Sequence, residues 1–260
     1  YHPESESLNT PRFTDLWPDC ETLRPSQEAL EESCRNGTVS PGLAIIEAPM
    51  GEGKTEAAIY LAEYWSRQTQ KSGSYIALPT MATSNQMYER YSEFINRYRP
   101  GVRPYLVHGM AWLIDELSST GQFSVNNSDR VDAREWFRSS KRALIAPEAV
   151  GTIDQALMAA LNVKFGFLRL LGLSSKVLIL DEVHACDEYM SVLLKRLLEW
   201  CGALRIPVIL LSATLSCKQK RELAQAYRED VELASIENVS YPLLTFIPFN
   251  GNPGVVPVDT

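Results

Sequence analysis

A loop with two glycines, placed between an apolar run and an amphipathic run, constrains the fold of this chain more than any other feature. Residues 43–47 are apolar up to their last position, residues 48–55 read Ala-Pro-Met-Gly-Glu-Gly-Lys-Thr, and residues 54–68 follow with helical periodicity. Gly51 and Gly53 let the backbone turn so that N–H groups point inward, and a helix N-terminus behind them attracts anions. A strand, a phosphate-binding loop and a helix in this order predict an α/β fold.

The side chains of this loop suit a nucleoside triphosphate, and we expect ATP with Mg²⁺. Lys54 can reach the β- and γ-phosphates, and the Thr55 hydroxyl can ligate the Mg²⁺ ion. A Gly-Lys pair followed by Ser or Thr occurs by chance in roughly one chain in ten of this length, so a glycine turn before an ordinary helix is the alternative. The other residues expected to contact the nucleotide are Met50, Gly51, Glu52, Gly53 and Glu56.

A second half of the same site is expected after another apolar run. Residues 177–180 are apolar and lead into Asp181, Glu182 and, two residues later, His184. Carboxylates at the end of a buried strand are costly unless a ligand or a reaction uses them. Asp181 would hold Mg²⁺ directly or through water, Glu182 would orient and deprotonate the attacking water, and His184 would sense the nucleotide state through a hydrogen bond. The alternative is an acidic turn ahead of a helix, capped by Asp187.

Two further segments have weaker signals. Ser212 and Thr214 follow the apolar run at residues 208–211, and their hydroxyls could link the phosphate site to movement elsewhere. Caps at helix starts use the same residue types. Gln27 lies upstream of the phosphate loop, where its amide could read an adenine edge by pairing a donor with an acceptor. A solvent-exposed position on a helix is the alternative for Gln27.

Short apolar runs and longer amphipathic runs alternate along the chain, which predicts a mostly parallel sheet with helices on both faces. Ligands on such a sheet bind beyond the carboxyl ends of the strands, where the residues above lie. We expect an irregular lead-in at residues 1–25, one α/β domain at residues 26–247 and an exit linker at residues 248–260. The expected strands are residues 43–47, 75–78, 104–107, 142–146, 177–180, 208–211 and 243–247, the expected helices are residues 26–35, 54–68, 82–98, 153–161, 188–200 and 218–227, and residues 118–132 are expected to form a loop.

The composition fits a folded cytoplasmic protein and limits the kinds of partner. The 32 acidic and 25 basic residues give a formal net charge of −7, which argues against broad electrostatic coating of nucleic acid. The 5 cysteines include no Cys-x-x-Cys pair, so they indicate reduced thiols and not a disulfide framework or a zinc site. No apolar run reaches the roughly 18 to 20 residues that a membrane-spanning helix needs, and we expect no membrane partner.

Taken in order, these segments resemble the first RecA-like lobe of superfamily 2 DExH helicases. In that family the phosphate loop commonly begins with alanine, as residues 48–55 do here, and residues 181–184 match the DExH box. The resemblance implies that residues 25–27 belong to the adenine-reading segment and that residues 212–214, with His184, couple the nucleotide state to movement. It also implies a RecA-like fold and ATP hydrolysis.

Two more segments resemble the motifs with which such helicases hold the phosphates of a single strand. They are residues 78–84, with the sequence Leu-Pro-Thr-Met-Ala-Thr-Ser, and residues 150–155, with the sequence Val-Gly-Thr-Ile-Asp-Gln. Caps at two helix starts are the alternative use of the same residue types. The residues that the resemblance assigns to the nucleic acid are Pro79, Thr80, Thr83, Gly151 and Thr152.

A closer resemblance is to the CRISPR-associated helicase–nuclease family of type I systems. It rests on residues 48–55, 78–84, 106–109, 150–155 and 181–185. The resemblance implies a motor that moves 3′ to 5′ on single-stranded DNA, with a guide-RNA surveillance complex as its partner. It also implies a second RecA-like lobe and a nuclease domain elsewhere in the parent chain.

The same resemblance predicts what this chain does not do. Its 3 histidines, His2, His108 and His184, do not form the histidine–aspartate cluster of the family's nuclease domain, so we expect no nuclease activity. Without a second lobe to supply arginines, we expect weak nucleotide binding and turnover close to nil. Two other classes stay open: a module that docks a guide complex or DNA with ATP as a structural ligand, and a P-loop switch or RNA-directed helicase.

Overall fold

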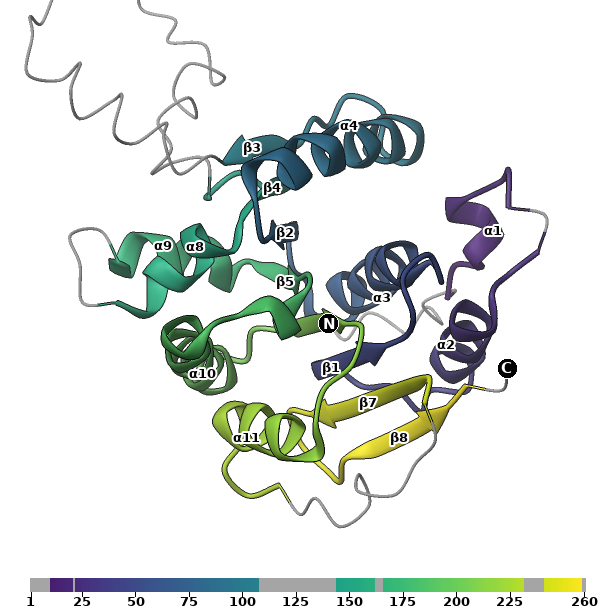
Figure 1. Cartoon of the computed structure of the whole chain (residues 1–260). Helices are drawn as coiled ribbons and strands as arrows, with labels where there is room; N and C mark the ends of the chain where they lie inside the picture. The colour runs from purple at the N-terminus through teal and green to yellow at the C-terminus, as the bar shows by residue number, and fades with distance from the viewer. Residues whose placement is uncertain (1–9, 21, 108–143, 162–165, 232–240, 259–260) are drawn as a thin grey trace, which may run out of the picture.

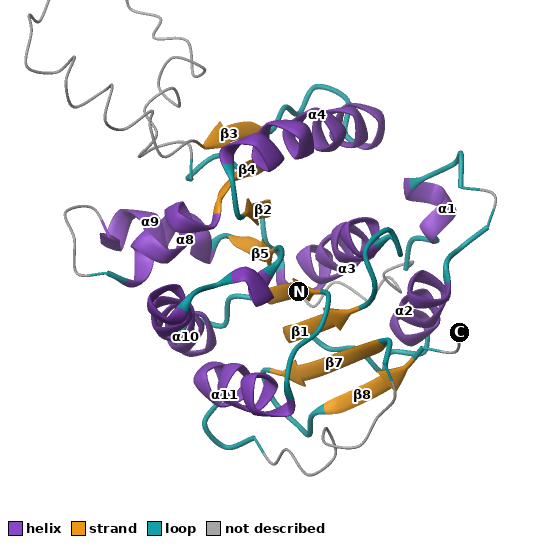
Figure 2. Ribbon diagram, in the orientation of Figure 1, coloured by secondary structure: helices purple, strands orange, loops and turns teal. Residues whose placement is uncertain are grey.

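The computed structural model describes residues 10–20, 22–107, 144–161, 166–231 and 241–258. Within these residues the chain forms one sheet of eight strands with helices on both faces (Figures 1 and 2). The strand order is β3-β4-β2-β5-β6-β1-β7-β8, and the predicted α/β fold is confirmed. The strands are β1 Gly42–Glu47, β2 Gly73–Leu78, β3 Tyr105–Val107, β4 Ala149–Thr152, β5 Lys176–Leu180, β6 Val208–Ser212, β7 Leu243–Pro248 and β8 Gly254–Pro257.

The sheet is parallel from β3 to β1, and β7 runs antiparallel to both β1 and β8. The strands β1, β2, β5 and β6 are buried along their whole length, as their apolar runs predict. Successive side chains of a strand point to opposite faces. In β1, Leu43 and Ile45 therefore pack in one core while Ala44 and Ile46 pack in the other.

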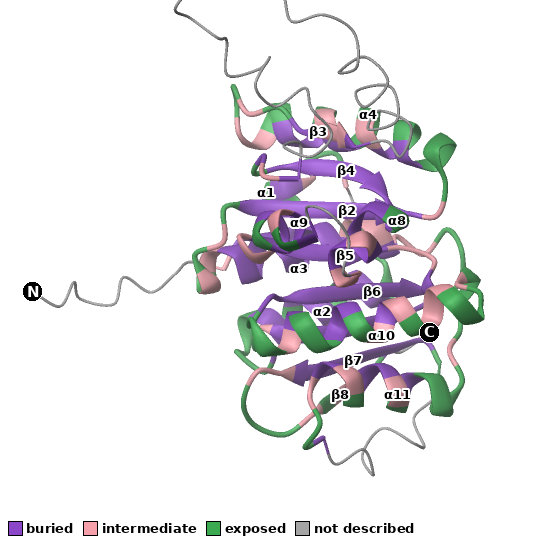
Figure 3. Cartoon of the chain, turned by 90° about the vertical axis from the view of Figure 1, so that its left-hand side faces the viewer, coloured by how far each residue is buried: buried purple, intermediate pink, exposed green. Residues whose placement is uncertain are grey.

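Two groups of helices cover the two faces, and the strands lie buried between them (Figures 1 and 3). No helix among the described residues is both long enough and apolar enough to cross a membrane. The first group is α1 Phe13–Leu16, α2 Pro25–Arg35, α3 Lys54–Thr69 and α4 Met81–Tyr98, and the second is α8 Ile153–Leu157, η1 Met158–Ala160, α9 Gly166–Ser174, η2 Val183–Ala185, α10 Glu188–Ala203 and α11 Cys217–Tyr227.

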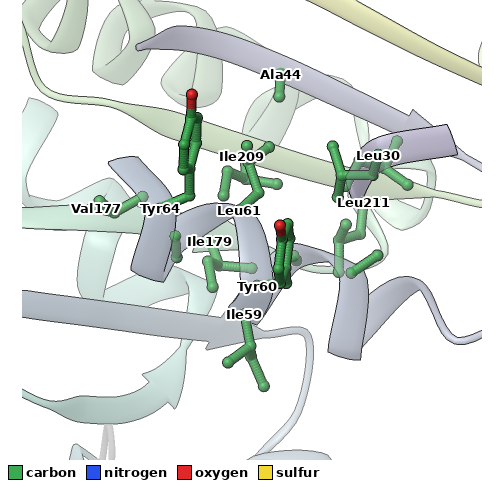
Figure 4. Packing of buried hydrophobic residues seen from close by; sticks show 14 of the residues in the cluster. Leu30, Ala44, Ile59, Tyr60, Leu61, Tyr64, Val177, Ile179, Ile209 and Leu211 are labelled. Carbon is green, nitrogen blue, oxygen red and sulfur yellow. The ribbon is translucent and has the colours of Figure 1, made fainter. Parts of the chain in front are cut away.

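The helix that follows the phosphate loop, α3, is fixed by its packing on the sheet. Figure 4 shows Leu61 of α3 close to the strand residues Ile179 and Ile209, all of them buried. Two tyrosines on the same helix satisfy their hydroxyls by donating to backbone carbonyls: Tyr60 to Pro11 at 2.9 Å and Tyr64 to Cys34 at 3.0 Å. The apolar contacts fix α3 on the sheet, and the two hydroxyls tie it to the residues that precede β1.

The strand expected at residues 142–146 was misplaced. Residues 144–148 form turns and bends, residues 142 and 143 lie outside the described residues, and the strand is β4. Pro147 has no N–H to donate to a neighbouring strand. The carboxylate of Glu148 instead accepts hydrogen bonds from Tyr91 at 2.6 Å and from Arg99 at 2.8 Å. The expected loop at residues 118–132 also lies outside the described residues.

The segments expected to be irregular at the two ends contain regular structure. Residues 13–16 form α1, and residues 254–257 form β8, which pairs with β7. Neither segment has a long periodic pattern, so both depend on tertiary contacts. The same reason applies to α9, which was not expected, and to α8, which ends before residue 161 and continues as the 3₁₀ turn η1.

A glycine in α10 provides a test of how closely the second group of helices packs. A Cβ at Gly202 would lie 1.8 Å from the carbonyl oxygen of Tyr227 at the end of α11. Alanine normally stabilises a helix interior relative to glycine by about 1 kcal/mol. Here we expect Gly202→Ala to lower the free energy of unfolding by about 1–3 kcal/mol, because α10 or α11 must shift.

Urea unfolding followed by circular dichroism measures this change. Gly254→Ala is the control, since a Cβ there would meet nothing within 4 Å, and we expect a change of less than about 0.5 kcal/mol. A Gly202→Ala variant as stable as the parent chain would contradict the close approach of the two helices.

Candidate nucleotide-binding site

The strand order brings the loops of interest to one edge of the sheet. The strands β5, β6 and β1 are neighbours, with Leu180 opposite Leu210 and Glu47 opposite Ser212. Because these strands are parallel, the segments that follow them leave from the same edge. The phosphate loop, the acidic pair and the Ser-Ala-Thr segment therefore meet there, although about 160 residues of sequence separate the first from the last.

The phosphate loop has the backbone that its glycines predict. Gly51 has a φ of 84° and Gly53 a φ of 69°, both in the left-handed region, and Gly53 is the N-cap of α3. Lys54, which is 8% exposed, lies across the loop and donates from Nζ to the carbonyl oxygens of Ala48 at 2.6 Å and Pro49 at 3.0 Å. The ammonium group is therefore held at the centre of the loop, where phosphate oxygens would replace the carbonyls.

A pocket of about 850 Å³ lies beside this loop, a size typical of small-ligand sites. Lys54 and Thr55 line it from α3, and Asp181 and Glu182 line it from the end of β5. Mg²⁺ commonly takes only one or two protein ligands, with phosphates and water completing its shell, and the Thr55 hydroxyl and the Asp181 carboxylate fit that need. The other predicted site residues in the pocket lining are Gln27, Met50, Gly51, Gly53 and Glu56.

Gln27 lies inside the site and not on an exposed helix face. It is 4% exposed, its Oε1 accepts from the Arg24 N–H at 3.1 Å, and its Nε2 donates to the Gly53 carbonyl at 3.3 Å. A Cβ on Gly53 would come within 2.2 Å of that nitrogen and displace the amide, and the left-handed φ of 69° favours glycine as well. Ser26 also donates to the loop, at the Glu52 carbonyl, 3.2 Å away. The segment at residues 24–27 thus braces the phosphate loop.

Some residues of the pocket were missed by the sequence reasoning. Phe13 of α1 and Trp17, directly after α1, line it, as does Arg90 of α4, which forms an ion pair with Glu56. Trp17 stacks on Phe94 of α4 with ring centroids 5.0 Å apart, and this contact joins α1 to α4. The i, i+4 spacing of Phe13 and Trp17 in a segment otherwise rich in polar residues was the available signal.

The acidic pair has an unusual local geometry. Glu182 has a φ of 54°, in the left-handed region, and its N–H donates to Asp181 Oδ1 at 2.8 Å. Burial, with a further contribution from the Glu182 carboxylate, raises the pKa of Asp181 from 3.8 to about 6. Lys54 acts in the opposite direction. Asp181 is therefore a carboxylate that a nearby cation would hold in its charged form.

His184 connects the acidic pair to the Ser-Ala-Thr segment. Its Nδ1 lies 3.2 Å from Glu182 Oε2, 3.3 Å from Ser212 Oγ and 3.3 Å from the Ala213 nitrogen. Nδ1 can donate to Glu182 only when it carries a proton, and it can accept from the Ala213 N–H only when it does not. Ser212 Oγ also lies 3.2 Å from the Thr214 carbonyl. The predicted coupling residues are thus in contact, with two alternative hydrogen-bond arrangements.

The two segments assigned to nucleic acid lie side by side, because Leu78 of β2 pairs with Thr152 of β4. Thr80 and Thr83 are exposed at the N-terminus of α4, where Thr80 accepts from the Thr83 N–H at 3.2 Å, and Pro79 is half-buried beside them. Gly151 and Thr152 are buried. The hydroxyls of α4 can reach a ligand, whereas the Thr152 side chain faces the protein interior.

The comparisons with known proteins agree with this geometry. The family model described as DEAD/DEAH box helicase matches residues 26–223, and the chain belongs to this family. Within it, the chain is similar to the CRISPR-associated nuclease/helicase Cas3 of Streptococcus thermophilus, with 39% identity over 226 residues that cover 80% of this chain and 24% of the relative. The resemblance inferred from the motifs is therefore confirmed.

Solved structures show the same relationship. The crystal structure of T. fusca Cas3 with AMPPNP matches at a TM-score of 0.81 and 40% identity, covering 96% of this chain and 29% of that chain. A chain in a structure described as a CRISPR RNA-guided surveillance complex, pre-nicking, matches at a TM-score of 0.68 and 37% identity, covering 93% of this chain and 25% of that one. This chain spans about a quarter of the length of the curated relatives it matches.

The raised pKa of Asp181 predicts how stability depends on pH. Between 3.8 and about 6 the folded state binds more protons than the unfolded state, so the contribution of Asp181 to stability rises as pH falls through that range. Above pH 6 the buried Asp181 carboxylate is charged, so Asp181→Asn should stabilise the nucleotide-free chain by an amount on the order of 2 kcal/mol. We expect that advantage at pH 8 and its loss near pH 4.

Urea unfolding in EDTA at a series of pH values measures this difference. Asp154→Asn, at an exposed position of α8, is the control and should not reproduce the pH-dependent gain. If Asp181→Asn were no more stable than the parent chain at pH 8, the raised pKa would be wrong.

Proposed function

We propose that this chain is the ATP-binding first motor lobe of an ATP-dependent helicase. The observation that carries the proposal is that Lys54 and Thr55 line the same pocket as Asp181 and Glu182. A triphosphate needs a cation at its β- and γ-phosphates and a carboxylate near its metal ion, and both stand within one cavity here. Membership of the DEAD/DEAH box helicase family and similarity to a protein solved with AMPPNP support the proposal.

The residues then have distinct tasks. Lys54 exchanges the loop carbonyls for phosphate oxygens, and Thr55 and Asp181 hold the metal. Mg²⁺, when bound, neutralises charge on the β- and γ-phosphates. Glu182 orients the attacking water and accepts its proton. His184 follows the change through its contacts with Glu182 and the Ser-Ala-Thr segment, 3.2–3.3 Å away.

The nucleic acid in this proposal is single-stranded DNA, on which the parent protein moves 3′ to 5′. Thr80 and Thr83, exposed at the start of α4, would bind its phosphates with the help of the helix N-terminus. The negative net charge of the chain means that the DNA path is shared with other parts of the parent protein. Those parts would be a second RecA-like lobe and a nuclease domain.

The cellular setting is also proposed from the relatives. A structure described as a CRISPR RNA-guided surveillance complex contains a chain 37% identical to this one. We therefore propose a guide-RNA surveillance complex as partner and a cytoplasmic role in CRISPR antiviral defence. A docking module that uses ATP only as a structural ligand, or a helicase directed to RNA, would be consistent with the same pocket, and the experiments below distinguish them.

Replacing the lysine of the loop tests the nucleotide site. Lys54→Met removes charge-assisted hydrogen bonds to phosphate worth about 1.5–3 kcal/mol, so we expect the Kd for Mg²⁺ and a fluorescent ATP analogue to rise roughly 10- to 100-fold. Fluorescence titration measures it. Lys218→Met, with a side chain 84% exposed on α11, is the control and should leave the Kd unchanged. Equal affinity of the Lys54→Met variant and the parent chain would exclude the proposed site.

Phosphate release from the same chain is expected to stay close to nil, with or without DNA. An arginine supplied by another lobe or protein accelerates such reactions by about 10³ to 10⁵, and the resemblance implies that a second lobe provides it. DNA-stimulated phosphate release by this chain alone would contradict that assignment.

Removing the hydroxyls at the start of α4 tests the proposed binding of single-stranded DNA. Thr80→Val with Thr83→Val removes two hydrogen bonds to phosphate, and we expect the Kd for labelled oligothymidylate to rise roughly three- to tenfold. The change also removes a helix cap, so Ser216→Ala, which removes the equivalent cap of α11, is the matched control. Fluorescence anisotropy measures both.

Repeating the titration with oligouridylate and with saturating ATP separates the alternatives. Tighter binding of RNA would favour an RNA-directed helicase, since the 2′-hydroxyl is the group by which a protein tells RNA from DNA at a given site. DNA affinity that does not respond to ATP would favour the docking module.

A further inference from the structure

Glu47, the last residue of β1, is a buried carboxylate that no step proposed so far uses. It is 3% exposed, its Oε1 accepts from the Leu215 N–H at 2.9 Å, and its Oε2 lies 3.0 Å from Nζ of Lys220 on α11. The Lys220 side chain is only 10% exposed. A charge in the core is costly unless it is paired and hydrogen-bonded, so the pair must be made for both side chains to remain buried.

The position of this pair is unusual because it joins two functional segments. Glu47 immediately precedes the phosphate loop, while Leu215 immediately follows the Ser-Ala-Thr segment. The backbone adds a second contact between them, from the Ala48 N–H to the Ser212 carbonyl at 3.4 Å. The Glu47 side chain therefore ties the base of one loop to the end of the other, and Lys220 anchors it to α11.

The carbonyl group of Ala48 contacts Lys54, the residue that must move when phosphate binds. The Ala48 carbonyl accepts from Lys54 Nζ at 2.6 Å. When Lys54 turns to a phosphate, this bond is lost at the residue next to Glu47. On the far side, Ser212 and Ala213 lie 3.3 Å from His184 Nδ1. A continuous set of contacts thus runs from Lys54, through Ala48 and Glu47, to the segment that contacts His184.

We propose that the Glu47–Lys220 ion pair is a positioning element that carries the nucleotide-dependent change of the phosphate loop to residues 212–215. The inference rests on the proposed nucleotide-binding function, and it assigns to the pair a role in communication and not in nucleotide affinity. Neither side chain lines the nucleotide pocket. Without the pair, the phosphate loop can still bind nucleotide, but its conformation no longer influences the contacts that residues 212–215 make with His184.

Hydrogen exchange of the 212–216 peptide, with and without Mg²⁺ and AMPPNP, tests the proposal on the whole chain. In the parent chain we expect nucleotide to change the exchange rate of this peptide. Glu47→Gln keeps an oxygen for the Leu215 N–H but leaves Lys220 without its counter-charge, and Lys220→Met leaves Glu47 without its own. Both should bind nucleotide within about threefold of the parent Kd and lose the nucleotide-dependent change at 212–216.

Two further variants separate communication from stability. Glu47→Gln combined with Lys220→Met removes both charges, so it should recover much of the thermal stability that the single variants lose without regaining the nucleotide-dependent change. Lys195→Met breaks the half-buried Lys195–Glu222 pair that α11 forms with α10. It is the matched control, and it should keep the change at 212–216.

The outcomes are distinct. A parent chain that does not bind AMPPNP would overturn the proposed function, and the inference with it. If the parent chain binds but its 212–216 peptide does not respond, or if the double variant responds as the parent does, the inference alone fails. It also fails if Lys195→Met abolishes the response, because the effect would then reflect any weakening of α11.

Discussion

The parallel register of β5, β6 and β1 is the constraint on which the rest of the site depends. Because β6 lies between the other two strands, three segments that are distant in sequence begin at one edge of the sheet. A slip of one residue in β1 would move Leu43 and Ile45 from one core into the other, and both cores are closely packed. The apolar packing therefore fixes where the loops start, and the loops need only supply the chemistry.

The cationic side chains of the pocket are paired with groups of the protein itself, and a nucleotide would replace the contacts of Lys54. Lys54 donates to two loop carbonyls, Arg24 donates to the Gly51 carbonyl, and Arg90 is paired with Glu56. Against these stand the Asp181 and Glu182 carboxylates, whose mutual repulsion helps to raise the pKa of Asp181. A bound metal ion would relieve that repulsion. Part of the free energy of nucleotide binding would be used to exchange these contacts, which would lower the affinity.

The sequence predicts the parts of this fold and site whose residues adjoin one another in the chain, and it fails for the parts that depend on contacts between distant residues. Gly53, Lys54 and Thr55 adjoin one another, and their strand and helix surround them, so the loop could be recognised and its backbone anticipated. By contrast, α1 has four residues, and its place depends on Trp17 stacking on Phe94, far along the chain. Similarly, β4 begins after Pro147 and Glu148, and the Glu148 carboxylate is satisfied by partners from other elements. No local pattern contains such contacts.

The segments that meet at this edge of the sheet are joined by two kinds of contact, backbone hydrogen bonds and side-chain contacts. The Asp181 N–H donates to the Ala77 carbonyl at 2.9 Å. Ala77 lies in β2, shortly before Thr80, so this contact is a backbone hydrogen bond at the edge of the sheet. The phosphate loop and the Ser-Ala-Thr segment follow the paired ends of β1 and β6, where Glu47 lies opposite Ser212. Beyond that pairing they are joined by the Glu47 side chain and by the 3.4 Å contact from the Ala48 N–H to the Ser212 carbonyl. A backbone ladder resists displacement, whereas a side chain can follow one by rotating. In the proposal above, the Glu47 side chain would therefore carry movement of the phosphate loop to residues 212–215, while the backbone link between β5 and β2 keeps its geometry.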